Sequence, residues 1–334
     1  MNVGVIGAGS WGTALAVMAA RAGHDVRLWS RNITVVDSIN REHVNPCYLK
    51  ETLIPDNVRA SSDAAEVAGA AELLVLAVPS HATRNLISQT AIVLRPEMVV
   101  VSASKGIEIE TGKRISVIYD EVVSAELRPR FVCLSGPSFA KEVVVDNPTA
   151  VVAAGVDGDA TRVVQSALSF KNLRIYTNDD LTGTELAGSL KNVIAIAAGM
   201  VAGLDFGSNS LAALITRGLA EITRLAVKQG ARVETMIGLA GVGDLVLTCT
   251  GNLSRNRFVG EQLGKGRTLE EIRSEMSEVA EGVKTTMAVK LLAEKTGVQM
   301  PITDEVYDVL YAKKSVTEAV TELMSRPLQT ERNW

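Results

Sequence analysis

The chain has 334 residues, which at about 150 residues per domain predicts two domains, each large enough to bury a core without disulfides. Its 34 basic and 38 acidic side chains give a formal net charge of −4, which excludes broad binding to nucleic acid or to an anionic membrane. Hydrophobic residues make up 47% and charged residues 22% of the chain, as in ordinary globular proteins rather than disordered ones.

Up to about residue 176, short apolar runs alternate with segments long enough for helices. Because these runs are apolar on both faces, they predict a mostly parallel sheet covered by helices. We expect a Rossmann-like doubly wound α/β domain over residues 1–178, with the direction of the later strands left open. The expected strands are Val3–Ile6, Asp25–Trp29, Leu73–Val78, Val99–Ser102, Phe131–Leu134, Ala150–Ala154 and Leu173–Tyr176.

A glycine-rich segment, Gly7-Ala8-Gly9-Ser10-Trp11-Gly12, follows the first expected strand and opens a helical pattern. In this context Gly7 makes a tight turn, Gly9 lets the backbone approach a diphosphate, and Gly12 allows close contact between helix and strand. The N–H groups at the helix start can then hold phosphate groups. The segment therefore predicts a dinucleotide-binding site, with a purely structural turn as the alternative.

The second expected strand ends at Trp29-Ser30-Arg31, where an acidic residue would bind the ribose 2′-hydroxyl of NAD. A guanidinium and a hydroxyl suit a 2′-phosphate instead. We therefore expect NADP(H) as the preferred cofactor, with NAD(H) not excluded and with Arg31 as a plain solvated side chain as the alternative.

Two further segments follow expected strands, at the edge where ligands of open parallel sheets collect. Lys105, in Ser102-Ala103-Ser104-Lys105-Gly106, can face a substrate anion or a polarised oxygen. Gly136 and Ser138, in Gly136-Pro137-Ser138-Phe139-Ala140, can offer backbone and hydroxyl groups. A surface-loop lysine and a structural turn are the alternatives.

Beyond residue 178 the pattern becomes helical, with helix spacing over Leu186–Leu204, Leu211–Gly230 and Thr285–Gly297. We expect an all-helical substrate-binding and catalytic domain over residues 179–334. No long Gly/Ser-rich or Pro-rich linker separates the halves, which predicts close packing of the domains and ligand sites in the cleft between them.

Lys191 lies near the start of the most apolar helical segment, on a face of small residues. A buried ammonium of this kind has either a bound partner or a lowered proton affinity, and the latter suits a general acid or base. Histidines are scarce and share no metal-ligand spacing, so a lysine is the expected proton donor and a metal is not expected. A snorkelling or salt-bridged lysine is the alternative.

Two later segments also precede helical stretches. Ser254-Arg255-Asn256-Arg257 resembles a phosphate site, because Ser254 can cap a helix and Arg255 can form bidentate bonds. Asp244, in Gly241-Val242-Gly243-Asp244, can bind hydroxyl groups or orient a lysine, with a helix cap as the alternative.

The cellular setting follows from cysteine use and apolar runs. Three scattered cysteines without a Cys-x-x-Cys pair indicate a reducing compartment. The first expected strand begins within a few residues of Met1, which leaves no room for a signal peptide. The longest apolar helical run, Val193–Leu204, is shorter than the roughly 20 residues of a bilayer span. We expect a cytoplasmic protein without membrane insertion.

Seven motifs in order resemble those of bacterial NAD(P)-dependent glycerol-3-phosphate dehydrogenases, over residues 1 to about 320. They are GAGSWGTALA, the SxSKGIE run at Ser102–Glu108, GPSFAKE at Gly136–Glu142, ELAGSLKNVIAIAAG at Glu185–Gly199, GxGDLxLTC at Gly241–Cys249, SRNRxxG at Ser254–Gly260 and VAEG at Val279–Gly282.

The resemblance implies a catalytic role for Lys191 and a set of contacts to ligands. The residues implied to contact glycerol 3-phosphate are Lys105, Gly136, Ser138, Asp244, Ser254, Arg255 and Asn256. Those implied to contact the cofactor are Ser10, Trp11, Arg31, Lys105, Ala140, Arg255, Val279 and Glu281. An acid such as Glu281 is also commonplace at the start of a helix.

The implied reaction is the reversible reduction of dihydroxyacetone phosphate to sn-glycerol 3-phosphate, which feeds phospholipid synthesis. Lys191 would protonate the developing alkoxide, Lys105 would stabilise its charge, and the segment at Ser254 would hold the phosphate. A homodimer is the commonest assembly for such an enzyme and is expected here.

Two other functions stay open at this stage. One is another Rossmann dehydrogenase with a helical second domain, of the 3-hydroxyacid or 6-phosphogluconate type, whose carboxylate substrate would not need the phosphate segment at Ser254. The other is a non-catalytic NADPH sensor, which would keep Gly7 to Gly12 but would not need Lys191 on an apolar face.

Overall fold

A computed structural model of the protein describes residues 1–276, 280–328 and 330–331, and the chain divides into two compact units. The first comprises Met1–Lys105 and Ile115–Leu181, and the second comprises Gly106–Arg114 and the chain from Thr182 onward. The sequence predicted a single break after residue 178. The difference has a physical reason, because Ile107 is buried in the apolar core of the helical unit.

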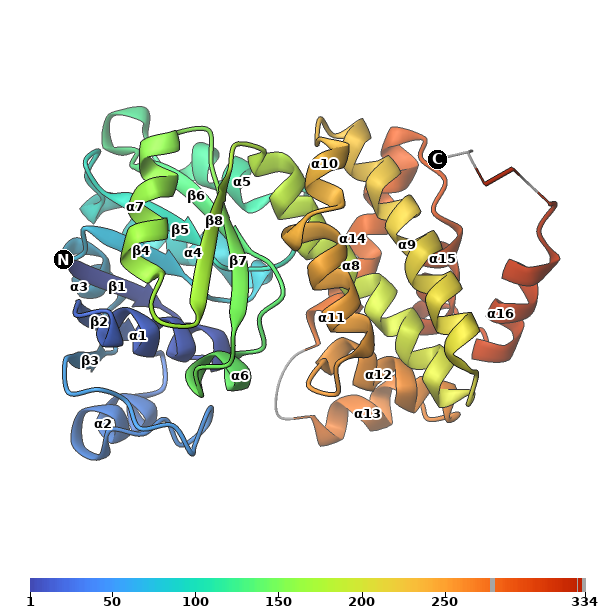
Figure 1. Ribbon diagram of the computed structural model, residues 1–334, viewed down its shortest axis with the longest axis horizontal. Coiled ribbons are helices and arrows are strands. Elements are labelled where there is room, and N and C mark those ends of the chain that lie inside the picture. Colours follow the sequence, from blue (N-terminus) through green and yellow to red (C-terminus); the bar gives the residue numbers. More distant parts are fainter. Residues whose placement is uncertain (277–279, 329, 332–334) are drawn as a thin grey trace. The chain divides into compact units, whose positions relative to one another are not determined.

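The first unit is built on one eight-stranded sheet with the strand order β3-β2-β1-β4-β5-β6-β7-β8 (Figure 1). All neighbouring strands are parallel except β6 and β7, which pair antiparallel. The expected Rossmann-like fold and its strands are confirmed. Of the later strands, whose direction the sequence left open, β7 and β8 run antiparallel to the others. The strands are β1 (Asn2–Ile6), β2 (Asp25–Trp29), β3 (Val58–Ser61), β4 (Leu73–Leu76), β5 (Val99–Ser102), β6 (Arg130–Ser135), β7 (Thr149–Ala154) and β8 (Leu173–Asn178).

Both faces of the central strands of this sheet are buried, as their apolar runs predicted. In β4, Leu73 and Val75 point into one apolar cluster, whereas Leu74 and Leu76 point into another. The first cluster takes residues from α1, α2, α6 and α7, and the second from α3, α4 and α5. The helices are α1 (Ser10–Arg21), α2 (Ile33–Glu42), α3 (Ala64–Gly69), α4 (Ser80–Thr90), α5 (Ile115–Val122), α6 (Ala140–Val144) and α7 (Gly158–Leu168).

From Thr182 onward, the described residues of the second unit form helices joined by loops, with no strand among them, which confirms the expected class of this region. A short π-helical segment, Leu239–Gly243, precedes α11. The α-helices are α8 (Leu181–Gly203), α9 (Ser208–Lys228), α10 (Val233–Met236), α11 (Asp244–Thr250), α12 (Arg255–Gly264), α13 (Leu269–Glu275), α14 (Glu281–Thr296), α15 (Pro301–Tyr311) and α16 (Val316–Ser325).

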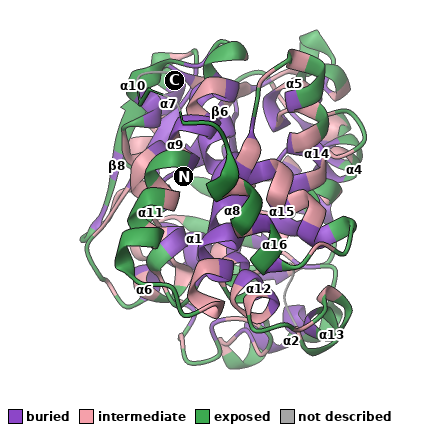
Figure 2. Cartoon of the chain, turned by 90° about the vertical axis from the view of Figure 1, so that its right-hand side faces the viewer, coloured by how far each residue is buried: buried purple, intermediate pink, exposed green. Residues whose placement is uncertain are grey.

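Helix α8 forms the centre of the helical unit (Figure 2). It has 23 residues, so the apolar run seen in the sequence is only part of a helix long enough to cross a membrane. However, 83% of its most apolar window is buried inside the protein, as in the core helix of a globular unit. A second apolar stretch, Val233–Thr250, is 44% buried and contains the π-helical segment.

An ion pair attaches the segment Gly106–Arg114 to α8. The Arg114 guanidinium lies 2.5 Å from a carboxylate oxygen of Glu185, and the Glu185 side chain is only 5% exposed. Removing one partner of such a buried pair leaves the other charge poorly solvated. Together with Ile107, this pair explains why a short segment from the first half of the chain belongs to the helical unit.

A buried carboxylate caps α15. Glu221, on α9, accepts hydrogen bonds from the backbone N–H groups of Ile302 at 2.7 Å and Thr303 at 3.3 Å. These bonds favour the charged form, yet burial dominates and raises the pKa of Glu221 to about 7, with a small opposing contribution from Arg224.

We expect this carboxyl group to make stability depend on pH. Between its ordinary pKa of 4.5 and about 7, the folded state holds a proton that the unfolded state has released. The contribution of this carboxyl group to the free energy of unfolding is therefore fully present below pH 4.5. It is lost as the pH rises towards 7, and the loss is on the order of 3 kcal/mol. Urea unfolding at several pH values should show a steeper loss for the wild type than for Glu221→Gln. Equal slopes would contradict the expectation.

Candidate functional site

The three glycines of the turn in the first unit differ in the space beside them. Gly7 has φ +121°, and an added Cβ would lie 2.5 Å from the Ala77 carbonyl oxygen. A Cβ on Gly12 would lie 1.8 Å from the Gly7 carbonyl oxygen. A Cβ on Gly9 would meet no atom within 4 Å. Gly7 and Gly12 thus have the packing roles expected of them, and Gly9 faces open space.

The start of α1 also suits a phosphate group. Gly9 is the N-cap residue, its position provides no side-chain cap, and the first turn from Ser10 has no acidic residue. The N-terminal N–H groups of a helix attract anions. The geometry therefore fits the dinucleotide that the sequence predicted.

Two of the other residues implied to bind the cofactor lie beside this turn. Trp11 and Ala140, the first residue of α6, pack against the same small cluster of Ala14, Leu49 and Val144. Within the described part of the chain, the Trp11 indole Nε1 is buried and has no hydrogen-bond partner, so this donor is one that a ligand could satisfy.

Arg31 lies two residues after the end of β2 and is exposed. The Gly7 amide donates to the Trp29 carbonyl at 3.2 Å, so the end of β2 lies directly beside the glycine turn. This is where the adenosine ribose of a dinucleotide is expected. The preference for NADP(H) stays a prediction.

The structure brings together Lys105, Gly136 and Ser138. The Gly136 carbonyl accepts from Lys105 Nζ at 3.3 Å and from Ser138 Oγ at 3.0 Å. Lys105 and Gly136 follow the neighbouring strands β5 and β6, which is why they meet. Gly136 has φ +129°, a conformation that favours glycine.

Lys191 is buried on α8 with two partners on α11. Its Nζ lies 2.5 Å from Asp244 Oδ1 and 2.6 Å from Thr248 Oγ1. The side chains of Lys191 and Asp244 are 5% and 1% exposed. Thr248 in turn donates its hydroxyl proton to the Asp244 backbone carbonyl at 2.6 Å. Asp244 and Thr248 therefore hold the ammonium in one orientation.

Cys249 follows Thr248 and is buried beside this group. Burial raises the pKa of the Cys249 thiol to about 12, although the Lys191 charge opposes the shift. The thiol is thus neutral at physiological pH, which makes it a poor nucleophile.

The start of α12 is a second anion-attracting helix end. Ser254 caps it, accepting from the Arg257 backbone N–H at 3.2 Å, as the sequence predicted. Arg255, the first residue of α12, is exposed. A serine cap, helix N–H groups and a guanidinium are the groups that phosphate sites use.

Asn256 connects three helices. Its Nδ2 donates to Asn192 Oδ1 at 3.0 Å, and its Oδ1 accepts from the Gly282 backbone N–H at 2.9 Å. Glu281, implied to contact the cofactor, precedes Gly282 and opens α14, whereas Val279 lies outside the described residues. Asn192 and Thr248 were not identified from the sequence, although Thr248 lies four residues after Asp244 on one helix face.

Glycines fix α12 against α8. A Cβ on Gly199 would lie 2.0 Å from the Arg257 carbonyl oxygen, and one on Gly260 would lie 1.9 Å from the Ile196 carbonyl oxygen. One turn on, Gly203 and Gly264 make similar close approaches. The two backbones are thus in direct contact, which fixes the start of α12 relative to Lys191.

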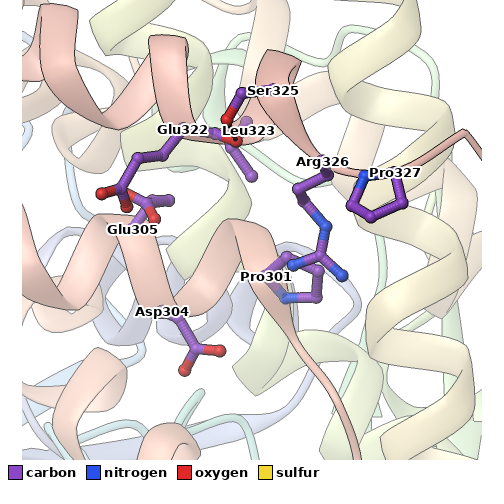
Figure 3. A pocket seen from close by; sticks show the side chains of 8 residues that line it. All are labelled: Pro301, Asp304, Glu305, Glu322, Leu323, Ser325, Arg326 and Pro327. Atoms are coloured by element: carbon purple, nitrogen blue, oxygen red, sulfur yellow. Dashed lines mark hydrogen bonds between the residues drawn. The ribbon is translucent and has the colours of Figure 1, made fainter.

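A cavity of about 420 Å³ lies between α15 and α16 and contains none of the expected site residues. Figure 3 shows the Glu305 and Glu322 carboxylates close together on one side and Arg326 on the other. Asp304 adds a third acidic side chain. Lys314 pairs with both Glu305 and Glu322, and Lys290 pairs with Asp304, so the acidic groups of this cavity already have cationic partners within the protein.

Comparison with known families agrees with the geometry. One family, described as the N-terminus of NAD-dependent glycerol-3-phosphate dehydrogenase, matches residues 2–161, and its C-terminal counterpart matches residues 180–321. The chain belongs to the NAD-dependent glycerol-3-phosphate dehydrogenase family. It is an NAD(P)-dependent oxidoreductase. The resemblance and the enzyme class expected from the sequence are thus confirmed, and the alternative of a non-catalytic NADPH sensor is ruled out.

Relatives match nearly the whole of this dehydrogenase. The NAD(P)+ glycerol-3-phosphate dehydrogenase of Koribacter versatilis is 52% identical over 332 residues, which cover 99% of this chain and 98% of the relative. That of Citrifermentans bemidjiense is 49% identical over 330 residues, with 99% and 98% covered. The crystal structure of glycerol-3-phosphate dehydrogenase from Coxiella burnetii has a TM-score of 0.93 and 38% identity, covering 97% of this chain and 99% of that one.

Proposed function

We propose that this dehydrogenase interconverts dihydroxyacetone phosphate and sn-glycerol 3-phosphate, with Lys191 as the general acid and base. The observation that carries the proposal is the buried Lys191 ammonium held by Asp244 and Thr248. A proton donor fixed in a site that excludes water is what carbonyl reduction requires. Family membership and the match to relatives named for this reaction support the same function.

The cofactor, when bound, supplies or accepts the hydride, and the residues of the first unit would hold it. The glycine turn and the start of α1 fit its diphosphate, Trp11 and Ala140 lie beside them, and Arg31 would face a 2′-phosphate. We propose NADP(H) as the preferred form, with NAD(H) also accepted. Glu281, Arg255 and Val279 are proposed as cofactor contacts from the sequence motifs alone.

Substrate contacts are proposed for the start of α12 and for two lysines, Lys191 and Lys105. Ser254, Arg255 and the N–H groups of α12 would bind the phosphate, so that binding energy places the carbonyl carbon correctly. Lys191 Nζ would give its proton to the carbonyl oxygen in the reduction and take it back in the oxidation. Lys105 would stabilise the negative charge on that oxygen, with Gly136 and Ser138 positioning its side chain. Asp244 would keep Lys191 oriented.

The decisive experiment follows the absorbance of NADPH with dihydroxyacetone phosphate, beside NADH and beside unphosphorylated dihydroxyacetone. We expect turnover with the phosphorylated ketone and at least about a hundredfold lower kcat/KM without the phosphate, because charge-assisted bonds at Arg255 are lost. A higher kcat/KM with NADPH than with NADH is expected from Arg31. Equal turnover of both ketones, or turnover of hydroxyacids instead, would contradict the proposed substrate.

Three further properties are proposed for the whole protein. It would act in the cytoplasm, where its product would feed phospholipid synthesis, and it would form a homodimer. Sedimentation equilibrium of the purified protein would test the homodimer.

A further inference from the structure

Asn45 is a fully buried amide that the reaction chemistry does not use. It lies in the loop after α2 and is 0% exposed. Its Oδ1 accepts from the backbone N–H groups of Cys47 and Tyr48, both at 3.1 Å. Its Nδ2 donates to the Ala8 carbonyl at 3.0 Å and to Thr13 Oγ1 at 2.9 Å. These partners fix the orientation of the amide, because N–H groups need the oxygen and a carbonyl needs the nitrogen.

The two bonds from Nδ2 hold the glycine turn at both of its ends. Ala8 lies between Gly7 and Gly9, and Thr13 lies in the first turn of α1, where its N–H also donates to the Gly9 carbonyl at 2.9 Å. In a trans peptide, the carbonyl and the following N–H point in opposite directions. Holding the Ala8 carbonyl towards Asn45 therefore turns the Gly9 N–H away from the loop.

We propose that Asn45 is a positioning residue for cofactor binding, which fixes the Ala8–Gly9 peptide so that its N–H faces the diphosphate. This inference rests on the proposed role of the glycine turn. The open space beside Gly9 supports that direction, because a Cβ there would meet no atom within 4 Å. The loop itself is anchored where Leu49 packs with Trp11 and Ala14, so Asn45 joins a fixed loop to the turn.

The test measures the dissociation constant for NADPH by nicotinamide fluorescence, together with thermal stability without cofactor and steady-state kinetics. In Asn45→Ala and the isosteric Asn45→Asp, we expect a dissociation constant about tenfold higher, the factor expected for one or two lost hydrogen bonds. The KM for NADPH should rise in parallel, while kcat at saturating NADPH and the KM for the ketone change little.

Asn57 provides a matched control at the other end of α1. Its Nδ2 donates to the carbonyls of Ala20 at 2.9 Å and His24 at 2.7 Å, so Asn57→Ala and Asn57→Asp likewise remove two hydrogen bonds donated by the amide nitrogen. These variants should lose stability but bind NADPH as the wild type does. Equal effects of the Asn45 and Asn57 variants on the dissociation constant would overturn the proposal. The proposal would also be overturned if only Asn45→Asp bound NADPH more weakly and high salt restored its binding. The added negative charge, and not the lost hydrogen bonds, would then be the cause.

Gly9→Val separates this inference from the proposed function on which it rests. Its side chain enters open space, so the protein should fold normally but fail to bind NADPH. If Gly9→Val binds NADPH normally, the proposed cofactor site is wrong. If Gly9→Val loses NADPH but both Asn45 variants bind it as the wild type does, only the role of Asn45 is wrong.

Discussion

Lys191→Met should lower kcat by about 10²- to 10⁴-fold, the range expected when a general acid is removed. Methionine has a similar length and no proton to donate, so the rest of the site keeps its shape. NADPH binding, measured by fluorescence, should be retained, because the residues proposed to hold the cofactor diphosphate lie in the other unit. Wild-type turnover in this variant would show that Lys191 is not the proton donor.

Stability complicates this experiment, and a double variant resolves it. In Lys191→Met, Asp244 keeps its buried charge without the ammonium, which costs about 3–5 kcal/mol. Adding Asp244→Asn removes that charge, so the double variant should regain much of the stability but none of the activity. Lys290→Met is the control, because Lys290 has ion pairs with Glu294 and Asp304 in the same unit but no proposed catalytic role. It should turn over normally.

Gly260→Ala should unfold the helical unit or prevent its folding. The new methyl group would lie 1.9 Å from the Ile196 carbonyl oxygen on α8, and a backbone atom cannot move aside as a flexible side chain can. The helices would have to separate, which costs several kcal/mol through lost packing between buried residues. The measurement is urea unfolding followed by far-ultraviolet circular dichroism.

Gly207→Ala is the matched control for this substitution. Gly207 is the N-cap of α9, has φ −73°, and a Cβ there would meet no atom within 4 Å. It should change the free energy of unfolding by about 1 kcal/mol or less. If both variants unfold at the same urea concentration, the close contact between α8 and α12 does not limit stability.

The sheet was predictable from sequence because its central strands are apolar on both faces. Strand β3 was missed, since it is a four-residue edge strand with Arg59 and Ser61 alternating with Val58 and Ala60. Helix α8 begins before the expected start at Leu186, because its first turn includes polar residues that the apolar pattern does not cover. The π-helical segment was not predictable, since it depends on Gly241 lying against the Met236 backbone.

The proposed site residues could be selected one by one from the sequence, but their pairing could not. Lys191 could be identified from the small apolar residues on its helix face. Its partner Asp244 is 53 residues away in the chain, and no local pattern indicates which acidic residue reaches a buried ammonium. Asn45 carries no motif, because its role comes from hydrogen bonds to residues 32 and 37 positions earlier.

The short segment Gly106–Arg114 limits how this protein can be divided or recombined. A fragment ending at residue 178 would expose Ile107, which is buried only within the helical unit. The helical unit expressed from residue 179 would lack Arg114 and thus lose the ion pair at Glu185. The two halves are therefore not interchangeable modules. A chimera of two related enzymes joined at a single crossover near residue 180 would combine the Ile107 and Arg114 of one parent with the helical core of the other.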